Sequence, residues 1–363
     1  MNIKSVIGGA IAISLVYLVI FLCFRACDKK EGASLSEEQV LETVTASSEE
    51  TSAAPAAPAD SMPSPAASVG TGDPLIGVEP YSESFFTYAS KTVPADVQKI
   101  IATSKVKAGI AVDLDSREVY WSLNPNTAYP MASVTKMMTA LVAVRKMLCS
   151  NGAITLETPI KVTRAASGIG GRQVWLDPKE TFTFDEILKC VLVHSANDCA
   201  YLLGEFMGNG DISSFIGDMN RQARELGCTH FHFINSHGLT EKAIKDENSG
   251  SPAELAYLAS VLLRIPQIMK WTGVRTEYLR ENDEAFKKRN KGQATMLSTS
   301  NSLLGSVPGV NGMKTGYTDN AGFCIVITCV RDEKHTCVVL MGCPDRKQRD
   351  ALGKALINWL YRS

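Results

Sequence analysis

Hydrophobic and polar positions divide the 363-residue chain into three unlike parts, the first of which is apolar. Ser5 to Phe24 form an uncharged run of 20 residues. At about 1.5 Å of rise per residue, a helix of this length matches the roughly 30 Å hydrocarbon core of a bilayer. We therefore predict a transmembrane signal-anchor over residues 1–27. A cleavable signal peptide is the alternative, but its apolar region is usually shorter and no clear A-x-A site follows the run.

The second part, residues 28–78, is rich in Ala, Ser, Pro and Glu and has few large apolar side chains. Such a segment cannot bury enough surface to offset the entropy lost on ordering. We predict a disordered linker that holds the third part, a folded domain over residues 79–363, away from the membrane.

Within the third part, the hydrophobic period predicts strands near both ends and helices between them. The expected elements are a short helix over 93–104, a hairpin over 107–124, a helix over 133–148, mainly helical structure over 150–300, strands over 322–330 and 335–343, and a closing amphipathic helix over 345–363. This order predicts an α/β plus α fold, in which one antiparallel sheet is built from both ends of the domain, is flanked by helices and receives a mainly helical insertion.

Two features refine the helical insertion. Apolar positions at helical spacing lie on both sides of His194-Ser195-Ala196-Asn197-Asp198, which predicts two helices joined there. Farther along, Asp211 is a candidate N-cap and Gly227 a candidate C-cap of the following helix.

Composition excludes some functions. The formal net charge of -1 gives no electrostatic case for nucleic-acid binding, which usually needs a basic face or stripe. Eight of the ten cysteines lie in the folded part without a C-x-x-C pair, so we expect no structural zinc site. Cys329 and Cys337 flank the turn of the last hairpin, and we hypothesise that they pair across it. His230 and His232 would share a strand face, but without a third nearby ligand we expect no metal there.

A Ser-x-x-Lys motif, Ser133 to Lys136, opens the apolar helix over 133–148. Unpaired N–H groups at a helix start favour negative charge on a serine oxygen. Lys136 would lie on the same face as Ser133. If nearby burial or another cation lowers the pKa of Lys136, its neutral amine can accept the serine proton. Ser104 to Lys107 fits the same pattern but leaves a short helix for a strand, so context favours Ser133.

Two further motifs gain meaning from their positions. Ser195-Ala196-Asn197 falls at the predicted junction of two helices, where a loop could present a hydroxyl and an amide to a cleft. Lys314-Thr315-Gly316 comes just before a strand, where a cation and a hydroxyl could bind a carboxylate. Gly316 would let a substrate backbone approach closely.

The three motifs in this order resemble the signature of penicillin-binding proteins and class A β-lactamases. The chain is similar to the low-molecular-mass penicillin-binding proteins, which are serine-type D-alanyl-D-alanine carboxypeptidases of the DD-peptidase/β-lactamase superfamily. The resemblance covers roughly Ala108 to Tyr361. It includes the stretches "PMASVTKMMTALV", "GGRQVWLDPKETFTFDEIL", "HSANDCAYLLGE", "FINSHGL", "SPAELAYLA", "TSNSLLGSVPGVNGMKTGYTDNAGFCIV" and "DRKQRDALGKALINWLY".

This resemblance implies a DD-peptidase catalytic domain that uses no cofactor. Ser133 would attack the D-Ala-D-Ala peptide bond and form an acyl-enzyme, with Lys136 as general base. Ser195 would relay a proton to the leaving amine, and Asn197 would bind the substrate amide. β-Lactams, which mimic the dipeptide, would acylate Ser133 and leave slowly.

The resemblance also implies a carboxylate and oxyanion site around the third motif. Lys314 would set the electrostatics of the site, and Thr315 would bind the terminal carboxylate. The backbone N–H groups of Ser133 and Tyr317 would form the oxyanion hole. Some members place an arginine where this chain has Ser300, and Arg346 and Arg349 are the candidates that would replace it.

We therefore expect a membrane-anchored D,D-carboxypeptidase that trims peptidoglycan stem peptides, with its catalytic domain on the outer side of the cytoplasmic membrane. Many members carry a β-rich domain and an anchoring helix after the catalytic domain; here we expect the N-terminal segment to anchor the chain. A D,D-endopeptidase would use the same groups. A β-lactamase fits less well, because the second motif is Ser-Ala-Asn rather than Ser-Asp-Asn and no convincing glutamate motif precedes Lys314. A catalytically silent penicillin-binding sensor is the alternative from another class.

Overall fold

The computed structural model describes residues 72–88, 91–241 and 246–362, which belong to one compact unit. The predicted anchor over Ser5 to Phe24 and nearly all of the predicted linker lie outside the described residues. Among the helices that are described, none is long and apolar enough to cross a membrane.

A six-stranded sheet joins the two ends of this unit, as the sequence predicts. Its strands are β1 (Thr87–Tyr88), β2 (Ala108–Asp113), β3 (Glu118–Leu123), β10 (Val310–Thr318), β11 (Gly322–Arg331) and β12 (Lys334–Cys343), in the order β1-β3-β2-β12-β11-β10. The antiparallel pairing of β12 with β2 closes the sheet across the helical insertion. Two details go beyond the prediction: β1 runs parallel to β3, and Lys314-Thr315-Gly316, which precedes β11 as predicted, itself lies within edge strand β10.

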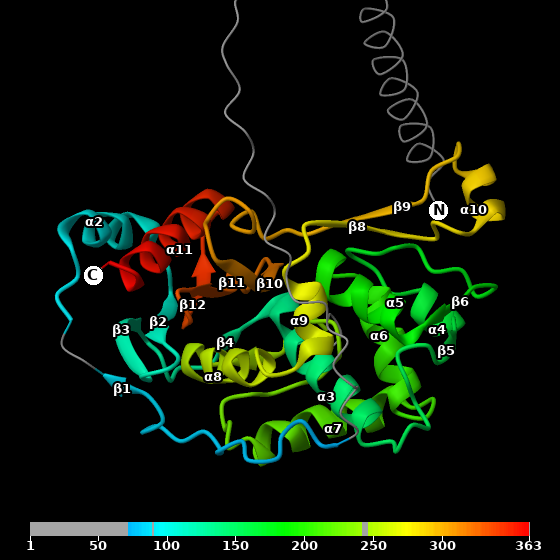
Figure 1. Cartoon of the computed structure of the whole chain (residues 1–363), viewed down its shortest axis with the longest axis horizontal. Helices are drawn as coiled ribbons and strands as arrows, with labels where there is room; N and C mark the ends of the chain where they lie inside the picture. The colour runs from blue at the N-terminus through cyan, green and yellow to red at the C-terminus, as the bar shows by residue number, and fades with distance from the viewer. Residues whose placement is uncertain (1–71, 89–90, 242–245, 363) are drawn as a thin grey trace, which may run out of the picture. The chain divides into compact units, whose positions relative to one another are not determined.

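Helices cover both faces of the sheet, because its central strands are apolar on both sides. Helices α2 (Ala95–Ser104) and α11 (Arg346–Leu360) pack on one face, and α8 (Pro252–Leu262) packs on the other (Figure 1). Along β11, Ile325 and Ile327 join the core beneath α11, whereas Val326 joins the core beneath α8.

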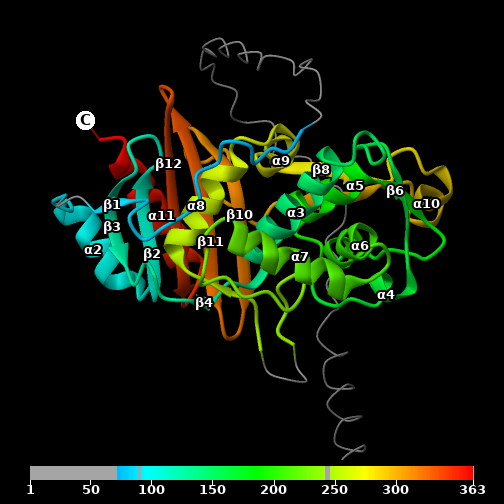
Figure 2. The same cartoon turned by 90° about the horizontal axis from the view of Figure 1, so that it is seen from below.

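The helical insertion lies beside β10, at the opposite edge of the sheet from β1 (Figure 2). Its helices are α3 (Lys136–Leu148), α4 (Arg164–Ser167), α5 (Phe184–Lys189), α6 (Asn197–Met207), α7 (Ile212–Glu225), α9 (Pro266–Thr272) and α10 (Glu284–Arg289), with a 3-10 turn η2 (Ala132–Thr135) and a π-helical turn η3 (Cys190–His194). Three short ribbons pair β4 (Tyr129–Pro130) with β7 (Ser249–Gly250), β5 (Pro159–Lys161) with β6 (Thr181–Thr183), and β8 (Thr276–Leu279) with β9 (Thr295–Ser298).

Both predicted caps of α7 are confirmed. The Asp211 side chain accepts a hydrogen bond from the backbone N–H of Ser213. Gly227, just past the end of the helix, has a φ of +74°, a left-handed conformation that glycine adopts without a Cβ penalty.

The hypothesised pairing of Cys329 with Cys337 is wrong. Cys329 lies opposite Thr336, and Cys337 lies opposite Thr328. Because side chains alternate between the faces of a strand, this offset of one residue directs the two thiols to opposite faces of the sheet. Cys329 joins the core under α11 and Cys337 joins the core under α8, and both are free thiols.

The two histidines of the HFH stretch each have an acidic neighbour. His230 Nδ1 lies 3.0 Å from Glu254 Oε1, and His232 Nε2 lies 3.7 Å from Asp246 Oδ2. Within the described ranges, no three His, Cys, Asp or Glu side chains are grouped so as to hold a metal ion.

Candidate active site

Ser133 occupies the 3-10 turn η2, and the α-helix α3 begins only at Lys136. Ala132, just before the serine, has a left-handed φ of +48°. Ser133 is partly exposed, whereas the residues on either side of it are buried. The turn therefore differs from the continuous helix that the sequence predicts. It leaves the Ser133 hydroxyl accessible, whereas the apolar side chains around it are buried.

A glycine from another segment makes this conformation possible. Gly238, with a φ of +86°, packs so closely on the turn that a Cβ atom there would lie 2.0 Å from the carbonyl oxygen of Ala132. The "HGL" stretch thus shapes the turn that carries Ser133.

Lys136 is completely buried, and its side-chain nitrogen contacts three oxygens. Nζ lies 2.9 Å from Ser133 Oγ, 2.7 Å from Asn197 Oδ1 and 2.6 Å from the carbonyl oxygen of His237. Burial, and secondarily the nearby charge of Lys314, lower the pKa of Lys136 well below its usual range. The expected proximity of Ser133 and Lys136 is therefore present, and the lysine is held where its neutral form is favoured.

Ser195 and Lys314 form a second hydrogen-bonded pair. The π-helical turn η3 ends at His194, and Ser195 takes a left-handed conformation with φ of 64°. Lys314 reaches from β10, and its Nζ donates to Ser195 Oγ at 2.7 Å and to the carbonyl oxygen of Thr315 at 2.9 Å. Burial, followed by the charges of Arg172 and Arg349, lowers the pKa of Lys314 to about 7.

Asn197 connects the serine–lysine pair to the loop that precedes α5. Its side-chain oxygen accepts from Lys136, and its Nδ2 donates to the carbonyl oxygen of Gly170 at 3.0 Å. Its backbone N–H donates to the carbonyl oxygen of Arg172 at 2.7 Å. Asn197, the last residue of the second motif, thus holds both Lys136 and the loop at Gly170 and Arg172 in place.

The two arginine candidates for carboxylate binding differ in their burial and in their hydrogen-bond partners. Arg349 is buried and donates to Asp350 through Nε and Nη2, at 2.8 Å and 2.6 Å. Arg346 is half-exposed and donates to the carbonyl oxygen of Ser300 at 3.3 Å. The Ser300 hydroxyl is hydrogen-bonded to the Thr315 hydroxyl, so the position at which the resemblance implies an arginine in some members here contacts Thr315.

These groups surround one cleft of about 320 Å³. It is lined by Ser133, Gly171, Arg172, Ser195, Asn197, Leu239, Ser300, Thr315, Gly316, Tyr317, Phe323, Arg346 and Arg349. Lys136 and Lys314 lie behind this lining, and no carboxylate is among the lining residues that the structure describes. Tyr317 is 52% exposed at the rim, with its ring centroid 4.3 Å from that of Phe323.

Sequence reasoning missed Arg172. Its guanidinium donates to the carbonyl oxygen of Ser298 and lies 3.4 Å from His194 Nδ1, and no ion pair involves it among the described residues. The residue belongs to the stretch "GGRQVWLDPKE", which carried the resemblance but no residue-level role. Its placement depends on a loop fold that has no hydrophobic period.

His194 and His237 lie next to residues of the site but are not among the residues that line the cleft. Burial and the Arg172 charge lower the pKa of His194 to about 4. Burial and the Lys136 charge lower the pKa of His237 to about 3. Both imidazoles are therefore neutral near pH 7, and His237 contributes its backbone carbonyl to Lys136.

The chain is similar to the proteins of one known family. A profile of the D-alanyl-D-alanine carboxypeptidase family, Peptidase S11, matches residues 93–345, which is more than half of the chain. The chain belongs to the Peptidase S11 family.

Family members in different bacteria are similar over the same region. D-alanyl-D-alanine carboxypeptidase DacF of Bacillus subtilis is 31% identical over 258 residues, covering 71% of this chain and 62% of the relative. DacA of Escherichia coli K12 is 27% identical over 278 residues, covering 75% of this chain and 64% of the relative. The chain therefore spans less than two thirds of the length of these two Peptidase S11 enzymes.

The fold is also that of a solved penicillin-binding protein. Penicillin-binding protein D2 of Listeria monocytogenes, crystallised in its ampicillin-bound form, superposes with a TM-score of 0.60 at 24% identity. The match covers 71% of this chain and 98% of that protein. The expected DD-peptidase fold is thus confirmed for this Peptidase S11 member.

Proposed function

We propose that this protein is a serine D,D-carboxypeptidase that removes the terminal D-alanine from peptidoglycan pentapeptide stems through an acyl-enzyme at Ser133. We also propose that β-lactams acylate the same serine. The observation that carries the proposal is that two serine–lysine pairs, Ser133 with Lys136 and Ser195 with Lys314, meet at one cleft.

The surroundings of Lys136 favour a neutral amine that acts as a base. The side-chain oxygen of Asn197 and the carbonyl oxygen of His237 can only accept, so they take the two N–H groups of a neutral amine. The nitrogen lone pair is then left for the Ser133 hydroxyl proton. Attack of Ser133 on the scissile carbonyl would transfer that proton to Lys136.

Ser195 and Lys314 would complete proton transfer to the leaving amine. Ser195 Oγ accepts from Lys314 Nζ, which leaves its own proton free to be donated to the departing nitrogen. Loss of that proton is followed by its replacement from Lys314, whose lowered pKa of about 7 suits proton transfer near neutral pH.

Substrate would lie along β10, because this strand forms an edge of the sheet and borders the cleft. An extended peptide can add to such an edge through backbone hydrogen bonds. Thr315, together with Arg346 and Arg349, would receive the terminal carboxylate. Gly316 lets β10 approach Ser133, so that the N–H groups of Ser133 and Tyr317 can stabilise the oxyanion.

The absence of a carboxylate among the described cleft-lining residues favours slow release of β-lactams over a β-lactamase activity. Hydrolysis of the natural acyl-enzyme would use Lys136 again as the base for water, after the proton that it took from Ser133 has passed to Lys314, which gave one up to Ser195.

Anchoring is a further part of the proposal. The uncharged run of residues 5–24 and the Ala/Ser/Pro/Glu-rich segment that follows support a membrane span and a spacer. The catalytic domain would face outward, where peptidoglycan lies. Protease treatment of intact spheroplasts tests this: outward placement predicts cleavage of the domain without lysis, and protection of the domain would contradict it.

The activity is tested with the full chain in detergent, incubated with a fluorescent penicillin and, separately, with a D-Ala-D-Ala-ended peptide. We expect stable labelling and D-alanine release, with both abolished in Ser133→Ala. Stable labelling without release would favour a sensor, and rapid penicillin turnover would favour a β-lactamase. Release confined to cross-linked dimers would favour an endopeptidase. Ser82→Ala, an exposed serine outside the cleft, serves as control.

A further inference from the structure

The side chain of Trp175 is largely exposed to solvent. Its 80% exposure is the highest of the large hydrophobic side chains in the described part of the chain. Tryptophan is usually buried over most of its surface, and large exposed apolar side chains often mark binding sites. Neither the catalytic groups nor the two cores account for this position.

The backbone of Trp175 is fixed in an unfavourable conformation. Its φ of +58° is left-handed, which bulky residues rarely adopt. Asp198 Oδ2 accepts from the N–H groups of Val174 at 3.1 Å and Leu176 at 3.2 Å, on either side of the tryptophan. Such strain persists only where the surrounding structure enforces it, and it is often associated with function.

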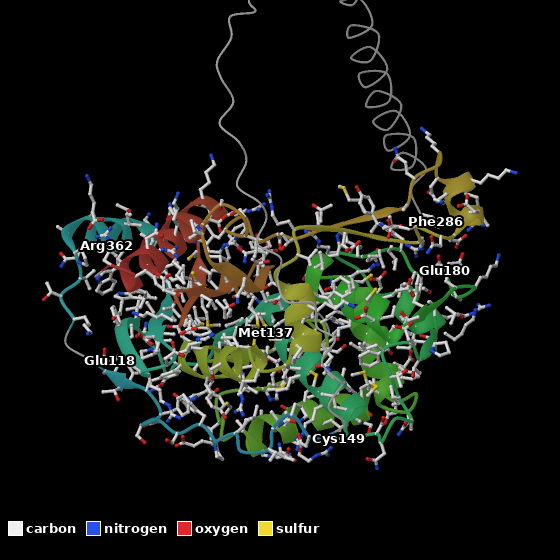
Figure 3. All side chains as sticks on the ribbon, in the orientation of Figure 1. Glu118, Met137, Cys149, Glu180, Phe286 and Arg362 are labelled. Atoms are coloured by element: carbon white, nitrogen blue, oxygen red, sulfur yellow. The ribbon has the colours of Figure 1, made fainter. Side chains whose placement is uncertain are left out.

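Arg280 fixes the same segment from the opposite side. This buried residue donates to the carbonyl oxygens of Val174 at 3.0 Å and Trp175 at 3.3 Å. It also pairs with Glu180 at 2.6 Å, and its guanidinium lies 4.6 Å from the centroid of the Phe286 ring. Glu180 accordingly lies near Phe286, which belongs to α10 (Figure 3). The backbone around Trp175 is thus held by Asp198 and Arg280, and this conformation leaves the tryptophan side chain exposed.

A groove of about 510 Å³ separates Trp175 from the segment that contains α10. Phe286 contributes a second aromatic ring to this groove, and the exposed amides of Asn290 and Gln293 contribute donors and acceptors. Arg289 also lines it. Aromatic faces stack on the apolar faces of sugar rings, and amide groups bond to hydroxyl and acetamido groups. The composition suits an N-acetylated sugar better than a lipid surface, which would need a broader apolar face.

The groove is linked to the catalytic cleft through one short loop. Gly171 and Arg172 line the cleft, and Val174 and Trp175, which follow after one residue, Gln173, line the groove. A polymer whose side branch enters the cleft could therefore contact Trp175 with its main chain. This polymer chemistry is that of a peptidoglycan strand, in which stem peptides branch from a chain of N-acetylated hexosamines.

We propose that Trp175 and the groove beside it bind the glycan chain of peptidoglycan. The choice of ligand rests on the proposed function, because the stem peptide in the cleft places a glycan within reach. The site is a binding surface remote from the scissile bond, so its loss affects polymeric substrate and spares a short soluble peptide.

Binding is measured first, in the Ser133→Ala background so that no turnover interferes. The probes are insoluble peptidoglycan stripped of its stem peptides by an amidase, and a soluble tetramer of β-1,4-linked N-acetylglucosamine. We expect co-sedimentation with the stripped glycan and a tryptophan fluorescence change with the tetramer. Trp175→Ala should weaken both about tenfold or more. Tyr88→Ala, an exposed aromatic on β1, should leave both unchanged.

Turnover is then compared in chains with Ser133 intact. Trp175→Ala should release D-alanine from a soluble pentapeptide within about twofold of the wild-type rate, and at least fivefold more slowly from polymeric peptidoglycan. Equal glycan binding by Trp175→Ala and its parent would overturn the proposal. So would equal losses on both substrates, or Trp175-dependent binding to anionic phospholipid vesicles without glycan binding. If the wild type releases no D-alanine at all, the proposed function fails, and the binding measurement still decides the role of Trp175.

Discussion

Gly316 lies directly against the turn that carries Ser133. A Cβ atom on residue 316 would stand 2.7 Å from the carbonyl oxygen of Met131 and 3.0 Å from the amide nitrogen of Ser133. The obstructing atoms are backbone, which cannot rotate away as a flexible side chain does. The separation between β10 and the nucleophile is therefore set by the absence of one side chain.

Gly316→Ala should consequently displace β10 from Ser133. Because a shift of about 1 Å can cost on the order of 100-fold in rate, we expect a loss of that size in acylation by fluorescent penicillin. Gly217→Ala in α7 is the matched control, since a Cβ there meets nothing within 4 Å. Acylation of Gly316→Ala at the wild-type rate would show that this contact does not position the site.

Lys314 should make stability depend on pH above neutrality. Its pKa is lowered to about 7 in the folded chain, against about 10.4 when unfolded, so between these values the unfolded chain binds the extra proton. The penalty for burying the charge is complete below pH 7 and is relieved as pH rises. From pH 7 to 9, the free energy of unfolding of the wild type should rise by about 2 kcal/mol relative to Lys314→Met, at about 1.4 kcal/mol per pH unit.

Denaturant unfolding at several pH values measures this difference. Lys354→Met, at an exposed position on α11, should show no comparable change relative to the wild type. A constant difference between wild type and Lys314→Met across the range would mean that Lys314 is not a buried cation of lowered pKa.

Arg172 should contribute to recognition of the substrate carboxylate, because its guanidinium lines the cleft and is in no ion pair within the described residues. We expect Arg172→Gln to raise KM for a D-Ala-D-Ala-ended peptide about tenfold, with little change in kcat. A thioester substrate whose leaving group lacks a carboxylate should show no such increase. Arg164→Gln, an exposed arginine of α4 outside the cleft, is the control. Equal effects on both substrates would indicate a structural role for Arg172.

Asp198 should be needed for stability, because its buried carboxylate accepts from the N–H groups of Val174, Leu176 and Cys199. In Asp198→Asn, an amide N–H would face one of these donors and leave it unpaired. We expect a loss of about 1–3 kcal/mol in the free energy of unfolding. Asp332→Asn, at an exposed turn position, should change it by less than about 0.5 kcal/mol. Wild-type stability of Asp198→Asn would argue against the hydrogen-bonding role of this carboxylate.

Much of the fold followed from local patterns. The period of apolar residues predicts the strands at both ends, the helices between them and the junction at Ser195, because each depends on which residues face a core. Asp211 and Gly227 predict the limits of α7, because capping is settled within one turn of chain. The three motifs are short and regular enough to be recognised before any folding is considered.

The sequence by itself therefore determined the order of elements and the residue types available for chemistry. Only the tertiary structure decided which groups meet: Lys136 reaches Asn197 and His237, and Lys314 reaches Ser195 across 119 positions of sequence. Periodicity records which side chains are buried, and it does not specify partners that are distant in the chain.

The left-handed backbone conformations and the strand register likewise could not be predicted from the sequence pattern. Ala132, Trp175 and Ser195 adopt positive φ values that packing imposes against local preference. Cys329 and Cys337 lie on opposite faces because one residue of register reverses every side chain in a strand. These choices depend on the sum of many contacts across the domain, and a local pattern does not contain that sum.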